Sequence, residues 1–138
     1  MSLIVQKYGG TSVSDVKKIK HVSRRIIERL EQGHSIVVVV SAMGDTTDKL
    51  LALAQSISDS PNPRETDVLL STGEIVASSL IALTLSDMGF EAISLSGSQA
   101  GIITDNLHGN AMIAEVNAGR ILKELDLGKI VIVAGFQG

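Results

Sequence analysis

The chain has 138 residues, of which 44% are hydrophobic but only 2% aromatic, and its formal net charge at pH 7 is -3. This length fits one domain of about 100–200 residues with an aliphatic core, as parallel strands covered by helices require. The absence of cysteine excludes disulfides and thiolate metal sites, and the three histidines show no ligand spacing, so no metal site is predicted. The acidic balance argues against nucleic-acid binding. With no leader and no apolar run of about 20 residues, we expect a cytoplasmic protein without a membrane contact.

The first notable stretch is the glycine turn, defined here as residues 7–12 (KYGGTS). It follows a short apolar run and precedes an amphipathic pattern, so it is predicted to join a strand to a helix. Two glycines allow the backbone to approach a ligand, and the helix-start N–H groups and the Lys7 ammonium attract anions. The stretch therefore predicts a phosphate site, although a plain strand-to-helix corner with a surface lysine fits these six residues equally well.

A helix is predicted over residues 14–32, capped by Ser12 or Ser14 and ended by Gly33. Its basic residues fit a solvated face better than a ligand role. Residues 36–40 (IVVVV) predict a central covered strand, and the hydroxyl-rich residues 41–48 follow it. Because ligands of open α/β sheets gather at the carboxyl ends of strands, Ser41 and Thr47 are candidate ligand contacts. Thr47 or Asp48 could equally cap the next helix.

Glu74 lies beside Gly73, after the apolar residues 68–70 and before a predicted helix at 75–83. A buried acid needs a partner, and a protein cation or a ligand ammonium would serve equally well. Further strands are expected at 92–95, 113–116 and 130–134, with a small-residue loop at 97–101. A helix capped by Asn117 and closed by Gly128 precedes the last strand. These elements predict an α/β fold, an open and mostly parallel sheet with helices on both faces.

Several blocks of sequence together resemble the successive signatures of aspartokinases, members of the amino acid kinase fold. They are KYGGTSV at 7–13, VVSAMGDTTD at 39–48, STGE at 71–74, GSQAG at 97–101 and VAGFQG at 133–138. The resemblance covers only the first part of the family's catalytic domain. Residues 1–138 are therefore expected to form its N-terminal, substrate-side part, without the later Arg-Gly-Gly-Ser-Asp stretch, the nucleotide-binding half and the regulatory domains.

The resemblance implies transfer of the γ-phosphoryl group of ATP, which carries Mg2+, to the side-chain carboxylate of L-aspartate. This is the first step towards lysine, threonine and methionine, and the parent protein is expected to be a homo-oligomer. The implied catalytic residue is Lys7, and the implied cofactor-binding residues are Lys7, Tyr8, Gly9 and Gly10. The implied substrate-binding residues are Ser41, Thr47, Glu74, Leu125 and Asp126, although Leu125 and Asp126 fit the end of a helix equally well.

Two other functions fit the same residues. One keeps the fold and changes the acceptor to glutamate, N-acetylglutamate, carbamate or a nucleoside monophosphate. The other is a non-catalytic module that binds a partner chain or a small anion. It suits the isolated chain, which is expected to be inactive alone, because a truncated domain leaves an apolar sheet edge and helix faces uncovered. A dinucleotide-binding fold fits less well, since the first turn lacks the G-x-G-x-x-G pattern.

Overall fold

The computed structural model describes residues 2–104 and 113–135. The strands are β1 (Leu3–Tyr8), β2 (Ser35–Val40), β3 (Ala92–Leu95), β4 (Ile102–Thr104), β5 (Ile113–Val116) and β6 (Ile130–Ala134). The helices are α1 (Val16–Glu31), α2 (Thr46–Ile57), α3 (Pro63–Asp87) and α4 (Gly119–Asp126), with a 3-10 helix at Gly10–Val13. Strand β4 was not predicted from the sequence.

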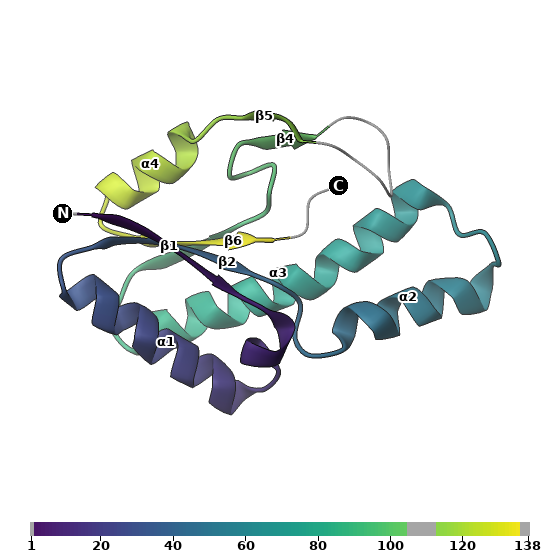
Figure 1. Ribbon diagram of the computed structural model, residues 1–138, viewed down its shortest axis with the longest axis horizontal. Coiled ribbons are helices and arrows are strands. Elements are labelled where there is room, and N and C mark those ends of the chain that lie inside the picture. The colour runs from purple at the N-terminus through teal and green to yellow at the C-terminus, as the bar shows by residue number, and fades with distance from the viewer. Residues whose placement is uncertain (1, 105–112, 136–138) are drawn as a thin grey trace.

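Four strands form one parallel sheet in the order β1-β2-β6-β3, and β4 and β5 form a separate antiparallel pair. Helices α1 and α3 cover one face of the sheet, and α4 lies on the other face, on the same side as β4 and β5 (Figure 1). The predicted α/β class with a mostly parallel sheet is confirmed. Because all four strands are parallel, their carboxyl ends meet at one edge, which is called the carboxyl edge below.

The two faces of the sheet are covered to different extents. On the α1 and α3 side, Ile36 and Val38 of β2 are completely buried, and on the α4 side Val37 is 6% exposed. This two-sided burial explains the unbroken β-branched run in β2. Strand β1 is an edge strand, and its Leu3 and Val5 are 52% and 62% exposed because they point away from α1. The prediction of a sheet covered on both faces therefore holds for the central strands and not for β1.

Helix α1 begins later than predicted. Asp15, rather than Ser12 or Ser14, is its N-cap, and the Asp15 carboxylate accepts a hydrogen bond of 2.8 Å from the backbone N–H of Lys18. The two serines are displaced from the cap position because residues 10–13 form the 3-10 helix. The predicted end is confirmed, since Gly33 follows the helix with a φ of 91°, a backbone angle that favours glycine.

Helix α3 is much longer than the predicted helix at 75–83. It begins at Pro63, with Asn62 as a side-chain cap, and residues 72–74 lie inside it. By length and mean hydropathy, 1.8 over its most apolar window, α3 could cross a membrane, which the sequence did not suggest. In this fold Ala77, Ile81 and Leu85 are completely buried against the sheet, so α3 is a core helix.

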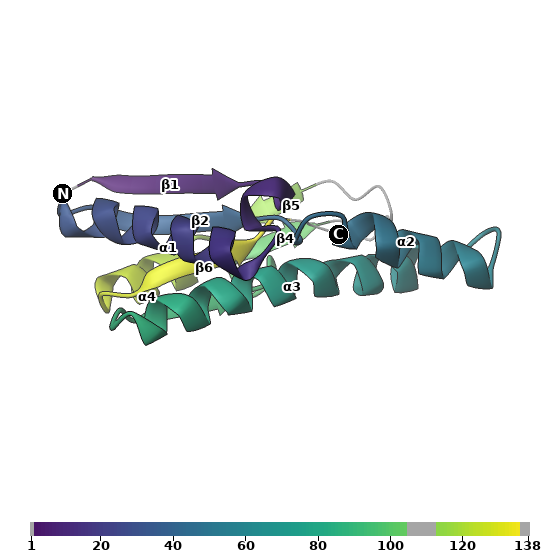
Figure 2. The ribbon, with the colours of Figure 1, turned by 90° about the horizontal axis from the view of Figure 1, so that it is seen from below.

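Helix α2 and the first half of α3 form a hairpin that extends past the carboxyl edge of the sheet (Figures 1 and 2). Helix α2 contains no buried residue. The hairpin therefore borders the carboxyl edge on one side.

At the opposite edge, an ion-pair cluster joins α4 to the start of β6. Glu124 accepts from Lys129 Nζ at 2.9 Å and from Arg120 Nε at 3.0 Å, and its side chain is 8% exposed. The hydrogen bond from Lys129 lowers the pKa of Glu124; burial partly opposes the shift, and Arg120 adds to it. The cluster fixes α4 against the sheet. The helix N-cap is Ala118 rather than the predicted Asn117, whose side chain instead accepts from Gly119 N–H at 3.0 Å.

Candidate functional site

Residues 40–44, which follow β2 at the carboxyl edge, are a packing centre and are called the hub below. A Cβ atom on Gly10 would lie 2.8 Å from the Ala42 carbonyl oxygen, and one on Gly73 would lie 3.0 Å from the Ala42 Cβ. A Cβ on Gly135 would lie 3.0 Å from the Val40 carbonyl oxygen. Only glycine permits backbone segments to approach this closely. Three glycines from separate parts of the chain thus allow the glycine turn, α3 and the end of β6 to meet at the hub.

Backbone hydrogen bonds hold the glycine turn against the hub. The N–H of Ser41 donates to the Tyr8 carbonyl at 3.2 Å, and the N–H of Gly44 donates to the Gly10 carbonyl at 2.9 Å. The position of the glycine turn is therefore set by β2 as well as by β1. The structure thus brings the predicted phosphate turn and the predicted Ser41 loop together.

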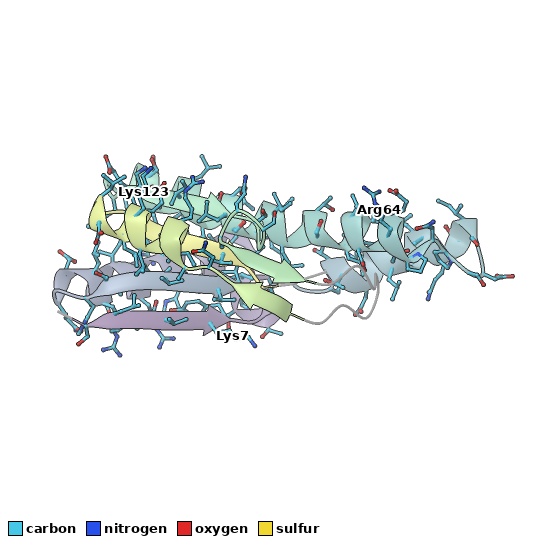
Figure 3. All side chains as sticks on the ribbon, turned by 90° about the horizontal axis from the view of Figure 1, so that it is seen from above. Lys7, Arg64 and Lys123 are labelled. Atoms are coloured by element: carbon cyan, nitrogen blue, oxygen red, sulfur yellow. The ribbon has the colours of Figure 1, made fainter. Side chains whose placement is uncertain are left out.

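Lys7 and Gly9 are the open part of the glycine turn. The Lys7 side chain is exposed on the face of β1 opposite Tyr8 and extends away from the sheet (Figure 3). Within the part of the chain that the structure describes, the Lys7 ammonium makes no hydrogen bond or ion pair. A Cβ on Gly9 would meet no atom within 4 Å, and its φ of -80° is available to any residue. The turn therefore presents a cation and an unobstructed backbone to solvent.

Ser41 is half-buried and Thr47 is exposed at the second position of α2. The alternative role of Thr47 or Asp48 as the cap of this helix is wrong. Asp45 occupies the N-cap position, without a side-chain cap hydrogen bond, so both residues fall within the first turn. No hydrogen bond of the Thr47 hydroxyl is found among the described residues, which leaves it able to contact a ligand.

Glu74 is buried, with 7% of its surface exposed, and its neighbour Gly73 packs against Ala42 of the hub. A second buried acid, Asp67, lies on the same helix with 6% exposed. Seven residues separate the two acids, so they share one face of α3. Asp67 is not among the residues predicted from the sequence, because the helix was expected to begin at Ile75 and the spacing of the two acids has meaning only within one helix. Helix α3 thus packs on the hub at Gly73, and the buried Glu74 is the next residue along the helix.

Leu125 and Asp126 lie away from the other predicted site residues. They end α4, which leads into β6 at the amino edge of the sheet, opposite the glycine turn (Figure 1). Leu125 packs into the smaller core cluster, and Asp126 is exposed. A helix that precedes a parallel strand must end where that strand begins, so this placement follows from the topology. The candidate site therefore consists of the predicted residues at the carboxyl edge and does not include Leu125 and Asp126.

Residues 2–104 and 113–135 contain no group of three or more His, Asp or Glu side chains that could hold a metal ion. The described residues thus do not fit a protein-bound metal ion.

The family model of the amino acid kinase family matches residues 2–138. The chain belongs to the amino acid kinase family. Over its whole length, this amino acid kinase chain is 55% identical to an aspartokinase of Geobacillus stearothermophilus and 54% identical to one of Mycolicibacterium smegmatis. It covers 34% and 33% of those proteins, so it spans about a third of their length. The resemblance to aspartokinases inferred from the motifs is confirmed.

Solved structures agree with this assignment. The crystal structure of aspartate kinase from Synechocystis matches 99% of the amino acid kinase chain with a TM-score of 0.84 and 49% identity, and 22% of its own chain is covered. Aspartokinase III of E. coli, solved in complex with aspartate and ADP, matches 99% of the chain with a TM-score of 0.82. At 21% identity and 41% coverage of that protein, the second match shows the shared fold.

Proposed function

We propose that the chain is the N-terminal, substrate-side part of a cytoplasmic, ATP-dependent aspartate kinase. The complete protein would transfer the γ-phosphoryl group of ATP to the side-chain carboxylate of L-aspartate, giving 4-phospho-L-aspartate for lysine, threonine and methionine synthesis. Relatives named aspartokinase at 55% and 54% identity support this proposal. The observation that carries it is the packing of both the glycine turn and α3 on the hub, with the Lys7 ammonium open and the buried Glu74 following Gly73 in α3.

The phosphoryl end of the reaction is assigned to the glycine turn. Phosphoryl transfer depends mainly on aligning donor and acceptor and on stabilising charge on the transferred group. Lys7 would neutralise part of that charge, and the N–H groups of Gly9 and Gly10 would donate hydrogen bonds to the phosphate oxygens. Because the described residues do not fit a resident metal, Mg2+ is assigned to the incoming nucleotide, where it would offset phosphate charge.

The acceptor end is assigned to the hub and its neighbours. The aspartate side chain is already ionised at pH 7 and is a nucleophile without help, so the enzyme needs no general base. Its task is to hold the acceptor. Glu74 would bind the substrate ammonium, and the hydroxyls of Ser41 and Thr47 would hydrogen-bond the substrate carboxylates. Glu74, Ser41 and Thr47 would therefore bind and align the substrate without transferring a proton.

The Lys7→Ala variant of the complete protein tests the phosphoryl end. We expect kcat to fall by roughly 10²–10³, the effect of removing one preorganised electrostatic contact. Stability should stay unchanged because the side chain is exposed. The control is Lys17→Ala, which removes an equally exposed lysine from α1. A coupled assay of ADP formation measures both variants, and an unchanged rate for Lys7→Ala would exclude the role of Lys7.

The Glu74→Gln variant tests the acceptor end while preserving side-chain volume. We expect a raised KM for aspartate with an unchanged KM for ATP, because the substrate ammonium loses its ionic partner. The opposite pattern, a raised KM for ATP and an unaltered KM for aspartate, would contradict the assignment. A parallel screen with glutamate, N-acetylglutamate and carbamate as acceptors tests the choice of aspartate itself.

A further inference from the structure

Helix α1 is strongly basic in an acidic chain. It carries six of the 12 Lys and Arg residues and only two of the 15 Asp and Glu residues, so its formal charge is +4 against -7 for the rest. Lys18, His21, Arg25 and Arg29 follow one another at steps of three or four residues. That spacing places them on one face of the helix. Three of the six Lys and Arg side chains of α1 thus lie along one stripe that the proposed function does not use.

A groove lies between this stripe and the end of β1. Its volume is about 330 Å3, within the usual range of about 300–1,000 Å3 for small-molecule sites. Its polar lining consists of Tyr8, Thr11, Ser12, Lys18, His21 and Arg25, which are called the basic groove below. The basic groove is therefore bordered by two cationic side chains, one histidine and three hydroxyl groups, all of which can donate hydrogen bonds.

The charges of the basic groove are not paired within the part of the chain that the structure describes. Among the described residues, Lys18, His21 and Arg25 form no ion pair, and the Lys18 ammonium donates only to the Thr11 carbonyl, at 3.2 Å. Burial raises the pKa of the Tyr8 phenol, and the guanidinium groups of Arg25 and Arg29 act in the opposite direction. Both guanidinium groups are thus close enough to influence the Tyr8 hydroxyl.

We propose that the basic groove binds a phosphate or polyphosphate group at a site separate from the one formed by Lys7. The two sites lie on opposite sides of β1, because the side chains of Lys7 and Tyr8 point to opposite faces of that strand. A phosphate monoester offers three strong acceptor oxygens and up to two charges, which suits this set of donors better than the two oxygens of a carboxylate.

Occupation of the groove would affect the glycine turn. Lys18 holds the Thr11 carbonyl within the 3-10 helix that follows Gly9. A phosphate that recruits the Lys18 ammonium competes with that hydrogen bond and changes the restraint on the turn. The basic groove is thus placed to act as an effector site for the neighbouring phosphoryl site.

Tyr8 is a specific reporter for this test, because the chain has one tyrosine and no tryptophan. Tyrosine fluorescence of the chain is titrated with inorganic phosphate, pyrophosphate and malate, each at constant ionic strength. We expect saturable signals from phosphate and pyrophosphate, weakened by added NaCl. Lys18→Gln and Arg25→Gln should each weaken binding by roughly fivefold or more, since each removes a charge-assisted hydrogen bond. The matched controls Lys17→Gln and Arg24→Gln remove equal charge outside the groove and should bind normally.

The Lys7→Gln variant separates the two sites. Binding that survives Lys7→Gln and is weakened by Arg25→Gln supports the basic groove, whatever the outcome of the kinase assays. Binding lost in Lys7→Gln and unaffected by Arg25→Gln would place the anion at Lys7, on the other side of β1, and overturn the proposal. Equal losses in Arg24→Gln and Arg25→Gln, tighter binding of malate than of pyrophosphate, or no saturable signal would also overturn it.

Discussion

The two glycines of the glycine turn should respond to alanine in opposite ways. In Gly10→Ala, the new Cβ would lie 2.8 Å from the Ala42 carbonyl oxygen and 3.0 Å from that of Gly44, both backbone atoms. Overpacking of this kind costs about 1–3 kcal/mol, and the lower entropy of the unfolded alanine chain returns about 0.4–1 kcal/mol. We expect a net loss of about 1–2 kcal/mol. In Gly9→Ala the Cβ meets nothing within 4 Å, so only the entropic gain remains.

Urea unfolding of the chain, followed by far-UV circular dichroism, measures the difference. With a slope of about 2 kcal/mol per molar urea, Gly10→Ala should lower the midpoint by roughly 0.5–1 M. Gly9→Ala should leave the midpoint unchanged or raise it slightly. Equal midpoints for the two variants would refute the claim that Gly10 is required by close packing against the hub, and a loss confined to Gly9→Ala would reverse it.

Two further variants test the packing at each edge of the sheet. Gly73→Ala would place a Cβ 3.0 Å from the Ala42 Cβ, which costs about 1–3 kcal/mol, whereas replacing a glycine inside a helix returns about 0.8–1 kcal/mol. The free energy of unfolding should therefore fall by up to about 2 kcal/mol in the same urea assay, and a rise of about 1 kcal/mol, the full helix gain, would contradict close packing of α3 on the hub. Folding lowers the pKa of Glu124, chiefly through the hydrogen bond from Lys129. The ionised Glu124 therefore stabilises the fold above pH 4.5, the ordinary pKa of the group, and this stabilisation is lost as the pH falls through the lowered pKa. Thermal melting between pH 3 and pH 6 should therefore show a steeper acid loss for the natural chain than for Glu124→Gln, and identical slopes would contradict this.

The sequence predicts the strands best where burial on both faces requires an unbroken run of apolar residues. Residues 36–40 and 130–134 are β-branched and apolar because helices cover both sides of β2 and β6. The full length of α3 could not be predicted in this way, because its apolar residues do not follow one clear stripe and Gly73 interrupts the helical pattern. Asp67 was missed for the same reason: with the helix expected to begin at Ile75, its relation to Glu74 could not be seen.

The candidate site depends on contacts between segments that are far apart in the sequence. The local pattern predicts a strand before Gly9 and Gly10 and a hydroxyl-rich loop after residues 36–40; Lys7 was expected after the first strand and lies within β1. The need for glycine at position 10 in its approach to Ala42 is not visible in the sequence, because it comes from a contact between distant segments. The distance of Leu125 from the other predicted site residues is likewise not visible in the sequence. Leu125 lies near the end of α4, where the chain enters β6, and so it is at the edge of the sheet opposite the carboxyl edge.

The most direct test is a crystal structure of the complete protein with L-aspartate and a non-hydrolysable ATP analogue. We expect the terminal phosphate within about 3 Å of Lys7 Nζ and of the Gly9 or Gly10 amide, with the aspartate ammonium beside Glu74. A terminal phosphate bound elsewhere, with Lys7 in solvent and Glu74 remote from the amino acid, would contradict it.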